Sequence, residues 1–334
     1  MPYTVAVSFN EFSKNIVDLD SGVTGIARAS RGFLISQLES LPEKIAGFPP
    51  LTGRFQNYGS FERKTKIREL DDIDLLVILD GNDTVPRPQP DYVYYLRLSS
   101  EEAPLYRFKD DGFDFVNSTK ILNRIRDSLK EVTHYEKAGI KRTEQAVTLK
   151  LSSYPWAYDI VPAVEIPDGN SGADGCYLIP DGKGNWIRTD PRRDAKALEP
   201  LRKEHSGYFL KVMRLLKFWN RLRTKLPSYY FETIVCKVLS QAARFTDEPI
   251  PNAIKHFFAA APTGILQACP DPKGLGPDLD EKIDSTKKNS VVKELLEADK
   301  NAGQAIAHKI KGDHEKAIYC WRQVFGNSFP AHGT

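Results

Sequence analysis

The sequence predicts an α/β (α+β) fold, with a mixed sheet followed by a mostly helical C-terminal lobe. The apolar run from Ile73 to Leu79 is rich in β-branched residues and too short for a typical helix, so it predicts a buried strand. The segment from Glu144 to Leu151 alternates polar and apolar residues, which predicts a second strand. Between Pro191 and Pro200 the character changes, and the chain beyond is almost entirely helical in pattern.

Composition limits the class of protein. A chain of 334 residues with a net charge of +3 fits one large domain or two intimate lobes, and no strong global field for nucleic acid is implied. The start of the chain lacks the pattern of a signal peptide, and no apolar run is long enough to predict a membrane-spanning helix. The cysteines form no C-x-x-C pair, which favours buried free thiols over a zinc ribbon and suits a cytoplasmic location; they are Cys176, Cys236, Cys269 and Cys320.

The N-terminal segment predicts helices with a structural role. Ser8 to Leu19 is expected to form a short helix with Ser8 as a candidate cap. A longer amphipathic helix is expected from Val23 to Leu41, and Pro42 is expected to end it.

The stretch 57–79 combines three features that carry chemistry. A small-residue turn, Gly59-Ser60, is followed by the polar and basic connector 61–70 and then by Asp72 and Asp74 at the mouth of the predicted strand. Strand side chains alternate, so both carboxylates point to one face and repel each other unless a cation lies between them. Oxygen ligands of this kind suit Mg²⁺, and a glycine lets backbone N–H groups approach a phosphate. Each feature alone is more often a solvated loop or a plain turn.

The middle of the chain is expected to add surface loops, a helix and further strands. Residues 81–90 (GNDTVPRPQP) predict an irregular surface excursion, and Phe115 to Tyr135 predict a helix. Asp159 opens another apolar strand, IVPAVEI, and the stretch 169–184 contains a hairpin-like section. A lone aspartate at a strand end is usually a turn residue, and only the first motif favours a functional reading of Asp159.

The C-terminal half predicts a helical lobe. Gly207 to Leu226 form a periodic helix that carries Lys217, and Ser228-Tyr229-Tyr230 are expected to cap a helix from Phe231 to Arg244. A polar loop follows near residues 271–289, and a final helical pair is expected at about 291–311 and 313–325.

These residues together resemble the polymerase β-type nucleotidyltransferase superfamily, and most closely the cGAS/DncV-like nucleotidyltransferases (CD-NTases). The resemblance rests on G-S-(spacer)-D-x-D with Thr65 in the connector, on the strands DDIDLLVIL and YDIVPAVEI, on the helix YFLKVMRLLKFWN and on the tail AIYCWRQVFGNSFP, and it covers nearly the whole chain. It implies a polymerase β-like catalytic core at residues 1–195, including the N-terminal helix, and a helical lobe at residues 196–334, with the active site in the cleft between them.

The resemblance also implies roles for single residues. Asp72, Asp74 and Asp159 would hold two Mg²⁺ ions, or Mn²⁺ in their place, about 3.5–4 Å apart and would carry out nucleotidyl transfer. Gly59, Ser60, Lys217 and Ser228 would bind the triphosphate, and Tyr229 would stack on the base. Arg54, Arg63, Lys64 and Lys66 add positive charge near the mouth, although exposed loop residues of this kind usually do nothing specific. A solvated lysine, a helix cap and an aromatic at the lobe interface are the simpler readings of Lys217, Ser228 and Tyr229.

The implied activity is the synthesis of a cyclic di- or trinucleotide second messenger from nucleoside triphosphates (ATP, GTP or pyrimidine nucleotides) in bacterial anti-phage signalling (CBASS). A downstream cyclic-nucleotide effector is the implied partner. The sequence shows no zinc insertion of the animal DNA-sensing kind, so direct activation by DNA is not implied. Two alternatives stay open: a terminal nucleotidyltransferase acting on RNA or a small molecule, and an inactive nucleotide-binding relative. The sequence leaves open the base selectivity, the 2′–5′ or 3′–5′ linkage, the ring size, the activator and the oligomeric state.

Overall fold

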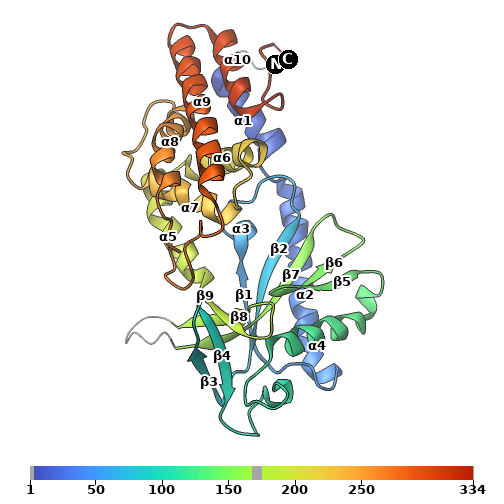
Figure 1. The fold of residues 1–334 in the computed structure, drawn as a ribbon. Coiled ribbons are helices and arrows are strands. Elements are labelled where there is room, and N and C mark those ends of the chain that lie inside the picture. Colours follow the sequence, from blue (N-terminus) through green and yellow to red (C-terminus); the bar gives the residue numbers. More distant parts are fainter. Residues whose placement is uncertain (1–3, 168–174, 334) are drawn as a thin grey trace.

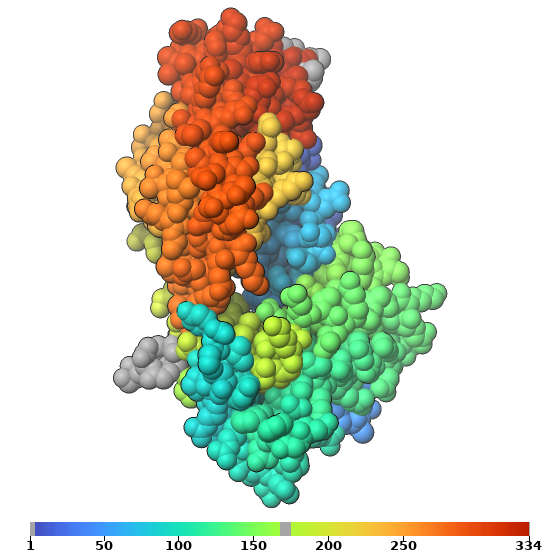
Figure 2. Space-filling view, in the orientation of Figure 1, coloured from blue at the N-terminus to red at the C-terminus, as the bar shows by residue number. Residues whose placement is uncertain are grey.

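The computed structural model describes residues 4–167 and 175–333, which form a sheet part and a helical part (Figure 1). The sheet part comprises the strands with helices α2, α3 and α4, and the helical part comprises α1, η1 and α5 to α10. The space-filling view shows a recess between the orange helices and the teal and green surface of the sheet part (Figure 2). The mixed sheet and the helical C-terminal part predicted from the sequence are confirmed.

The sheet contains both parallel and antiparallel pairs. Its order is β1-β2-β7-β8-β9-β4-β3, with β6 pairing β7 and β5 pairing β6. Among these neighbours β2 and β7 run parallel, while β1 and β6 lie antiparallel to their partners. The strand bounds are β1 Leu51–Tyr58, β2 Asp72–Leu79, β3 Thr84–Pro88, β4 Val93–Leu98, β5 Gly139–Thr143, β6 Ala146–Lys150, β7 Ala157–Ile166, β8 Cys176–Pro180 and β9 Trp186–Thr189.

The helices follow the periodicity of the sequence, with some shifts at their ends. The helix bounds are α1 Val5–Phe12, η1 Ser13–Val17, α2 Ser21–Lys44, α3 Gly59–Glu62, η2 Tyr106–Phe108, α4 Ser118–Lys130, η3 Thr133–Tyr135, α5 Pro191–Glu204, α6 Phe209–Arg223, α7 Ser228–Leu239, α8 Pro249–Leu266, α9 Ser285–Ile310 and α10 His314–Phe325. In the part of the chain that the structure describes, no helix is long and apolar enough to cross a membrane.

Alternation along β2 separates the two faces of the sheet. Ile73, Leu75 and Val77 are fully buried in a large cluster with residues of α2 and α4. Leu76 and Ile78 point the other way, into a small apolar cluster with residues of β7 and β8. Because side chains alternate, Asp72 and Asp74 share the second face, which is the face turned away from α2.

A second large core holds the helical part together. It gathers α1 and η1 with α5 to α10, and its aromatic contacts include Phe9 against Trp321 with ring centroids 4.9 Å apart. The N-terminal helix α1 therefore packs with the C-terminal helices, although it precedes the sheet in the sequence. Figure 1 shows α1 in blue beside the red α10 at one end of the molecule.

Several local predictions are wrong, each for a physical reason. Residues 84–88 form strand β3 rather than an irregular excursion, because both prolines there lie on an edge strand that pairs only with β4. The first helix begins at Val5 and is capped by the Thr4 hydroxyl, so Ser8 is not its cap. Pro42 lies inside α2, which continues to Lys44.

The predicted hairpin is present as β8 and β9, and its residues 169–174 lie outside the described residues.

Candidate active site

The aspartates singled out in the sequence lie on one face of neighbouring strands. Asp72 and Asp74 begin β2, and Asp74 pairs in register with Asp159 on the parallel strand β7. Residues that pair in register on adjacent strands point to the same face, so the three carboxylates share the face opposite α2. The strand pairing thus joins segments that lie 85 residues apart in the sequence.

Each carboxylate has its own neighbours in the structure. Asp72 Oδ1 lies 2.5 Å from Lys66 Nζ, and the same ammonium also pairs with Asp71. Asp159 Oδ1 accepts a hydrogen bond of 2.7 Å from the Thr148 hydroxyl on β6. The Asp74 carboxylate lies directly against the backbone of Gly59.

The electrostatics of the site favour a bound cation. Burial raises the pKa of Asp74 to about 7, and the negative charges of Asp72 and Asp159 add to the effect. Burial likewise raises the pKa of Tyr58, with Asp74, Asp159 and Asp72 contributing. Like charges confined in this way are relieved by a divalent cation, and carboxylate oxygens are suitable ligands for Mg²⁺.

The carboxylate oxygens are therefore suitable ligands for Mg²⁺, although the three side chains do not all point towards one common ion position in the structure. Within residues 4–167 and 175–333, no three His, Cys, Asp or Glu side chains are grouped so as to hold a metal ion. The contacts of Asp72 with Lys66 and of Asp159 with Thr148 explain this, because each carboxylate is turned towards a partner from the protein.

Gly59 meets two demands that exclude a side chain. Its φ of +76° lies in the left-handed region that favours glycine, and an added Cβ would stand 1.7 Å from Asp74 Oδ2. Gly59 also begins the short helix α3, so the predicted turn is a helical turn. The close approach of backbone and carboxylate explains why a glycine stands at this position.

A cavity of about 570 Å³ brings together predicted residues from both parts of the molecule. Ser60 and Asp72 line it from the sheet part, and Lys217 and Ser228 line it from the helical part. Gly59 lines a neighbouring cavity of about 450 Å³ against the start of α5. Ser228 is the first residue of α7 and Pro227 is the cap, so the prediction that Ser228-Tyr229-Tyr230 cap a helix beginning at Phe231 is wrong.

A buried ion cluster joins the connector to the helical part, and sequence reasoning missed its centre. Glu232 on α7 lies 2.5 Å from Lys217 Nζ and 3.1 Å from Arg63 Nη2, and it also accepts a 3.1 Å hydrogen bond from the Thr65 hydroxyl. Burial acts to raise the pKa of Glu232, and the charges of Lys217 and Arg63 outweigh it, so this pKa lies below its usual value. A lone glutamate in the apolar helix FETIVCKVL, one turn after Ser228, is the signal that could have found it.

Arg63 and Lys66 are therefore not the unspecific loop residues that the sequence suggested. The Arg63 side chain is 12% exposed and pairs with Glu232, and Lys66 pairs with Asp71 and Asp72. Arg54 on β1 forms a more exposed ion pair of 2.5 Å with Glu165.

Tyr229 is held at its hydroxyl and lies outside the lining of the 570 Å³ cavity. Its hydroxyl donates a 2.6 Å hydrogen bond to Asp194 on α5 and accepts one of 2.7 Å from Lys273. The Lys273 ammonium lies 4.1 Å from the ring centroid and the Arg63 guanidinium 5.9 Å from it. In this arrangement the ring interacts with protein cations.

Comparisons with known proteins identify the family of the chain. The chain is 37% identical over 336 residues to a probable cyclic nucleotide synthase of Bacillus cereus, and the match covers 99% of each protein. The chain belongs to the cGAS/DncV-like nucleotidyltransferases, the CD-NTases. A cyclic AMP-AMP-AMP synthase of Escherichia coli is 24% identical over 298 residues, which cover 81% of each chain. No family model matches the chain.

Solved CD-NTase structures share the fold over nearly the whole chain. The E. coli CdnC structure with ATP has a TM-score of 0.69 at 19% identity and covers 97% of this chain and 98% of that one. Vibrio cholerae DncV, a cyclic AMP-GMP synthase bound to a linear intermediate, has a TM-score of 0.66 at 12% identity and covers 99% and 98%. The protein is thus a nucleotidyltransferase of the CD-NTase family, and the aspartate face lies on a fold shared with these enzymes.

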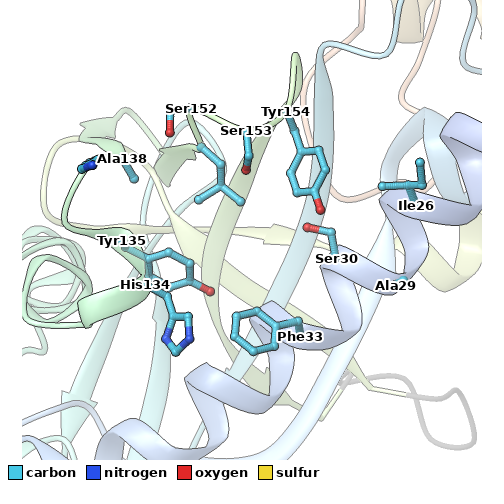
Figure 3. Close-up of a pocket in the computed structure, with 12 residues that line it drawn as sticks. Ile26, Ala29, Ser30, Phe33, His134, Tyr135, Ala138, Ser152, Ser153 and Tyr154 are labelled. Carbon is cyan, nitrogen blue, oxygen red and sulfur yellow. The ribbon is translucent and has the colours of Figure 1, made fainter.

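A further cavity of about 470 Å³ lies on the opposite face of this CD-NTase, beside α2 (Figure 3). Its lining is aromatic and hydroxylic: the Phe33 and His134 rings meet edge to face at 5.2 Å, and the Ser30 and Tyr154 side chains point towards each other. Because α2 covers the face away from the aspartates, this cavity is separate from the candidate active site.

The contact between Gly59 and Asp74 makes a testable prediction. We expect Gly59→Ala to lower turnover by at least about 100-fold, because the new methyl group displaces the Asp74 carboxylate and loss of one preorganised charged group typically costs that much. The measurement is the initial rate of pyrophosphate release from nucleoside triphosphates.

Gly53→Ala on β1 is the matched control. Gly53 has a similar φ of +74°, and an added Cβ there would meet no atom within 4 Å. Both variants carry the same backbone strain, and only Gly59→Ala disturbs Asp74. Equal rates in the two variants would show that strain alone accounts for any loss.

Proposed function

We propose that this CD-NTase joins nucleoside triphosphates into a cyclic di- or trinucleotide second messenger and releases pyrophosphate. The observation that carries the proposal is the 570 Å³ cavity, in which Ser60 and Asp72 of the sheet part meet Lys217 and Ser228 of the helical part. A hydroxyl and an ammonium beside a carboxylate suit a triphosphate whose reacting end lies at the aspartates. The likeness over 99% of the chain to a probable cyclic nucleotide synthase supports the same activity.

The substrates are proposed from the chemistry of the cavity and from the related structures. ATP, GTP or pyrimidine nucleotides would lie with the α-phosphate at the aspartates and the triphosphate tail towards Ser60, Lys217 and Ser228. The structures of E. coli CdnC with ATP and of V. cholerae DncV with pppA(3′,5′)pG support triphosphate substrates and stepwise joining. Tyr229 would stack on the base; in the structure its ring lies beside the Arg63 guanidinium and the Lys273 ammonium.

Three carboxylates and one glycine would carry out the reaction. Asp72, Asp74 and Asp159 would hold two Mg²⁺ ions, or Mn²⁺, which when bound neutralise phosphate charge and clamp the attacking and leaving oxygens. Asp159, oriented by the Thr148 hydroxyl, would activate the acceptor hydroxyl. Gly59 lets the backbone approach the Asp74 carboxylate and the β- and γ-phosphates. Positioning and charge neutralisation supply most of the rate in such a site.

We also propose a division of labour along the chain and a biological setting. Residues 1–195 would form the catalytic core and residues 196–334 the helical lobe. The end of β9 at Thr189 and the start of α5 at Pro191 support a boundary just before α5, while α1 and η1 pack with the helical lobe. The product would act on a cyclic-nucleotide effector in bacterial anti-phage signalling (CBASS), in the cytoplasm.

A product assay tests the proposed function. Purified protein is incubated with all four nucleoside triphosphates and Mg²⁺ or Mn²⁺, treated with phosphatase and analysed by mass spectrometry. A phosphatase-resistant species with the mass of a cyclic di- or trinucleotide supports the proposal and identifies the bases. Linear products formed only when RNA or a small-molecule acceptor is added would instead indicate a terminal nucleotidyltransferase.

The role of Lys217 gives a separate prediction. We expect Lys217→Ala to raise the KM for nucleoside triphosphates by about 10- to 100-fold, because a charge-assisted hydrogen bond contributes about 1.5–3 kcal/mol. Lys217→Arg keeps the positive charge, so we expect a smaller rise in KM than in Lys217→Ala. An unaltered KM in Lys217→Ala would contradict the assignment.

A further inference from the structure

The turn between α6 and α7 is shaped by one buried side chain. Asn220, on the last turn of α6, is 5% exposed. Its Oδ1 accepts hydrogen bonds from the Leu226 N–H at 3.0 Å and from the Thr224 hydroxyl, and its Nδ2 donates to the Leu226 carbonyl at 3.0 Å. The Asn220 carbonyl also accepts from the backbone of Lys225 at 2.7 Å. The amide thus defines the path of residues 224–226.

This turn holds Lys225 in an unusual conformation. Its φ of +53° lies in the left-handed region, which favours glycine or asparagine, yet the residue is a lysine. Its side chain is exposed and lines the 570 Å³ cavity, with Lys66 and Lys217 also in the lining. A strained backbone that presents a charged side chain to a cavity points to a use for that side chain.

Within the described part of the chain, Lys225 differs from the other cations of this cavity in having no protein partner. Lys66 pairs with Asp71 and Asp72, Lys217 pairs with Glu232, and Arg221 donates 2.5 Å to the Arg68 carbonyl. Across residues 4–167 and 175–333, no hydrogen bond or ion pair engages the Lys225 ammonium. It is the cation of the lining that remains available to an anionic ligand without breaking an existing contact.

We propose that Lys225 binds the terminal phosphate of the nucleoside triphosphate and that Asn220 is the positioning residue that presents it. The inference rests on the proposed function. The reacting phosphate lies at the aspartates, so the terminal phosphate, which carries the most charge, lies farther out. Lys225 is exposed at the rim of the cavity, whereas Lys66 and Lys217 are largely buried. An ammonium at the rim therefore reaches the end of the triphosphate tail.

Calorimetric titration with nucleotides tests this assignment. The four nucleoside triphosphates and their diphosphates are titrated into wild type and Lys225→Ala, with Ca²⁺ replacing Mg²⁺ so that bound substrate is not consumed. We expect Lys225→Ala to weaken triphosphate binding by about tenfold, as for the loss of one ionic hydrogen bond, and to leave diphosphate binding within about twofold. Lys225→Arg retains most of the preference for triphosphate. Lys293→Ala removes an exposed lysine of α9 outside the cavity and changes neither affinity.

Two further variants separate binding from folding. Lys225→Gly relieves the left-handed strain, so we expect a higher Tm together with the same loss of triphosphate preference. Asn220→Ala reduces the preference in the wild-type background and has no further effect on it in Lys225→Ala, because Asn220 acts through Lys225.

The outcomes distinguish the two proposals. If wild type binds triphosphates and Lys225→Ala keeps the full preference over diphosphates, the role of Lys225 is overturned and the proposed function stands. If wild type binds no nucleoside triphosphate, both are overturned.

Discussion

Asp74→Asn is expected to lower cyclic product formation by at least about 1,000-fold, the upper range for loss of one preorganised electrostatic group. Asp74 is the central carboxylate of the site, since it pairs in register with Asp159, follows Asp72 on the same face and packs against Gly59. Asparagine keeps the shape but removes the charge that a cation at this face requires. The measurement is the initial rate of product formation in the mass-spectrometric assay with Mg²⁺.

The stability of this variant provides the control. The pKa of Asp74 is raised in the folded protein to about 7 from an ordinary 3.8, so the folded state binds the proton more tightly than the unfolded state. Without metal, this carboxylate therefore destabilises the fold as the pH rises from about 4, and the effect is complete above 7. Asp74→Asn should have a Tm equal to or above that of wild type in metal-free buffer at pH 8. A folded variant with activity within tenfold of wild type would remove Asp74 from the catalytic site.

The parts of the fold that depend on local pattern are predictable from the sequence. Strand β2 follows from a β-branched apolar run, and α4 and α6 follow from apolar residues at helical spacing. Strand β3 is not predictable in the same way, because its prolines resemble a loop until the pairing with β4 is known. The end of α2 and the start of α7 differ from prediction. Pro42 lies inside α2 instead of ending it, and Ser228 is the first residue of α7 instead of preceding the helix as its cap.

The candidate site divides along the same line. The shared face of Asp72 and Asp74 is predictable because the alternation of side chains along a strand is local. The prediction that Asp159 joins them depended on the family resemblance, because no local pattern shows which residues of β7 pair with β2. Glu232 could not be paired with Arg63 from sequence alone, because the two residues are 169 positions apart and the contact forms only when the connector packs on α7. Long-range ion pairs of this kind have no periodicity that a sequence displays.

Glu232→Ala is the second variant for which we expect a large effect. Glu232 is 5% exposed, and its carboxylate neutralises Lys217 and Arg63 while accepting from Thr65. Removing one partner of a buried ion pair typically costs about 3–5 kcal/mol, because the remaining charges are left buried without compensation. We expect a loss of that order in the free energy of unfolding, measured by denaturant titration. Glu297→Ala, at an exposed position on α9, is the control and should change it by less than about 0.5 kcal/mol.

We expect the same cluster to link the stability of the protein to substrate binding. Arg63 and Thr65 follow α3, which carries Ser60, and Lys217 reaches the cavity from α6. Glu232 therefore holds the two sides of the 570 Å³ cavity together. Glu232→Gln keeps the side-chain volume but removes the carboxylate charge. We expect it to raise the KM for nucleoside triphosphates, because the ion pair that fixes the position of Lys217 is lost. The folded pKa of Glu232 is depressed, so its stabilising contribution is present above its unfolded pKa near 4.5 and is lost as the pH falls through the folded value. The stability difference between wild type and Glu232→Gln should therefore shrink below about pH 4.5; a difference that is constant between pH 4 and pH 8 would mean that the Glu232 charge contributes nothing.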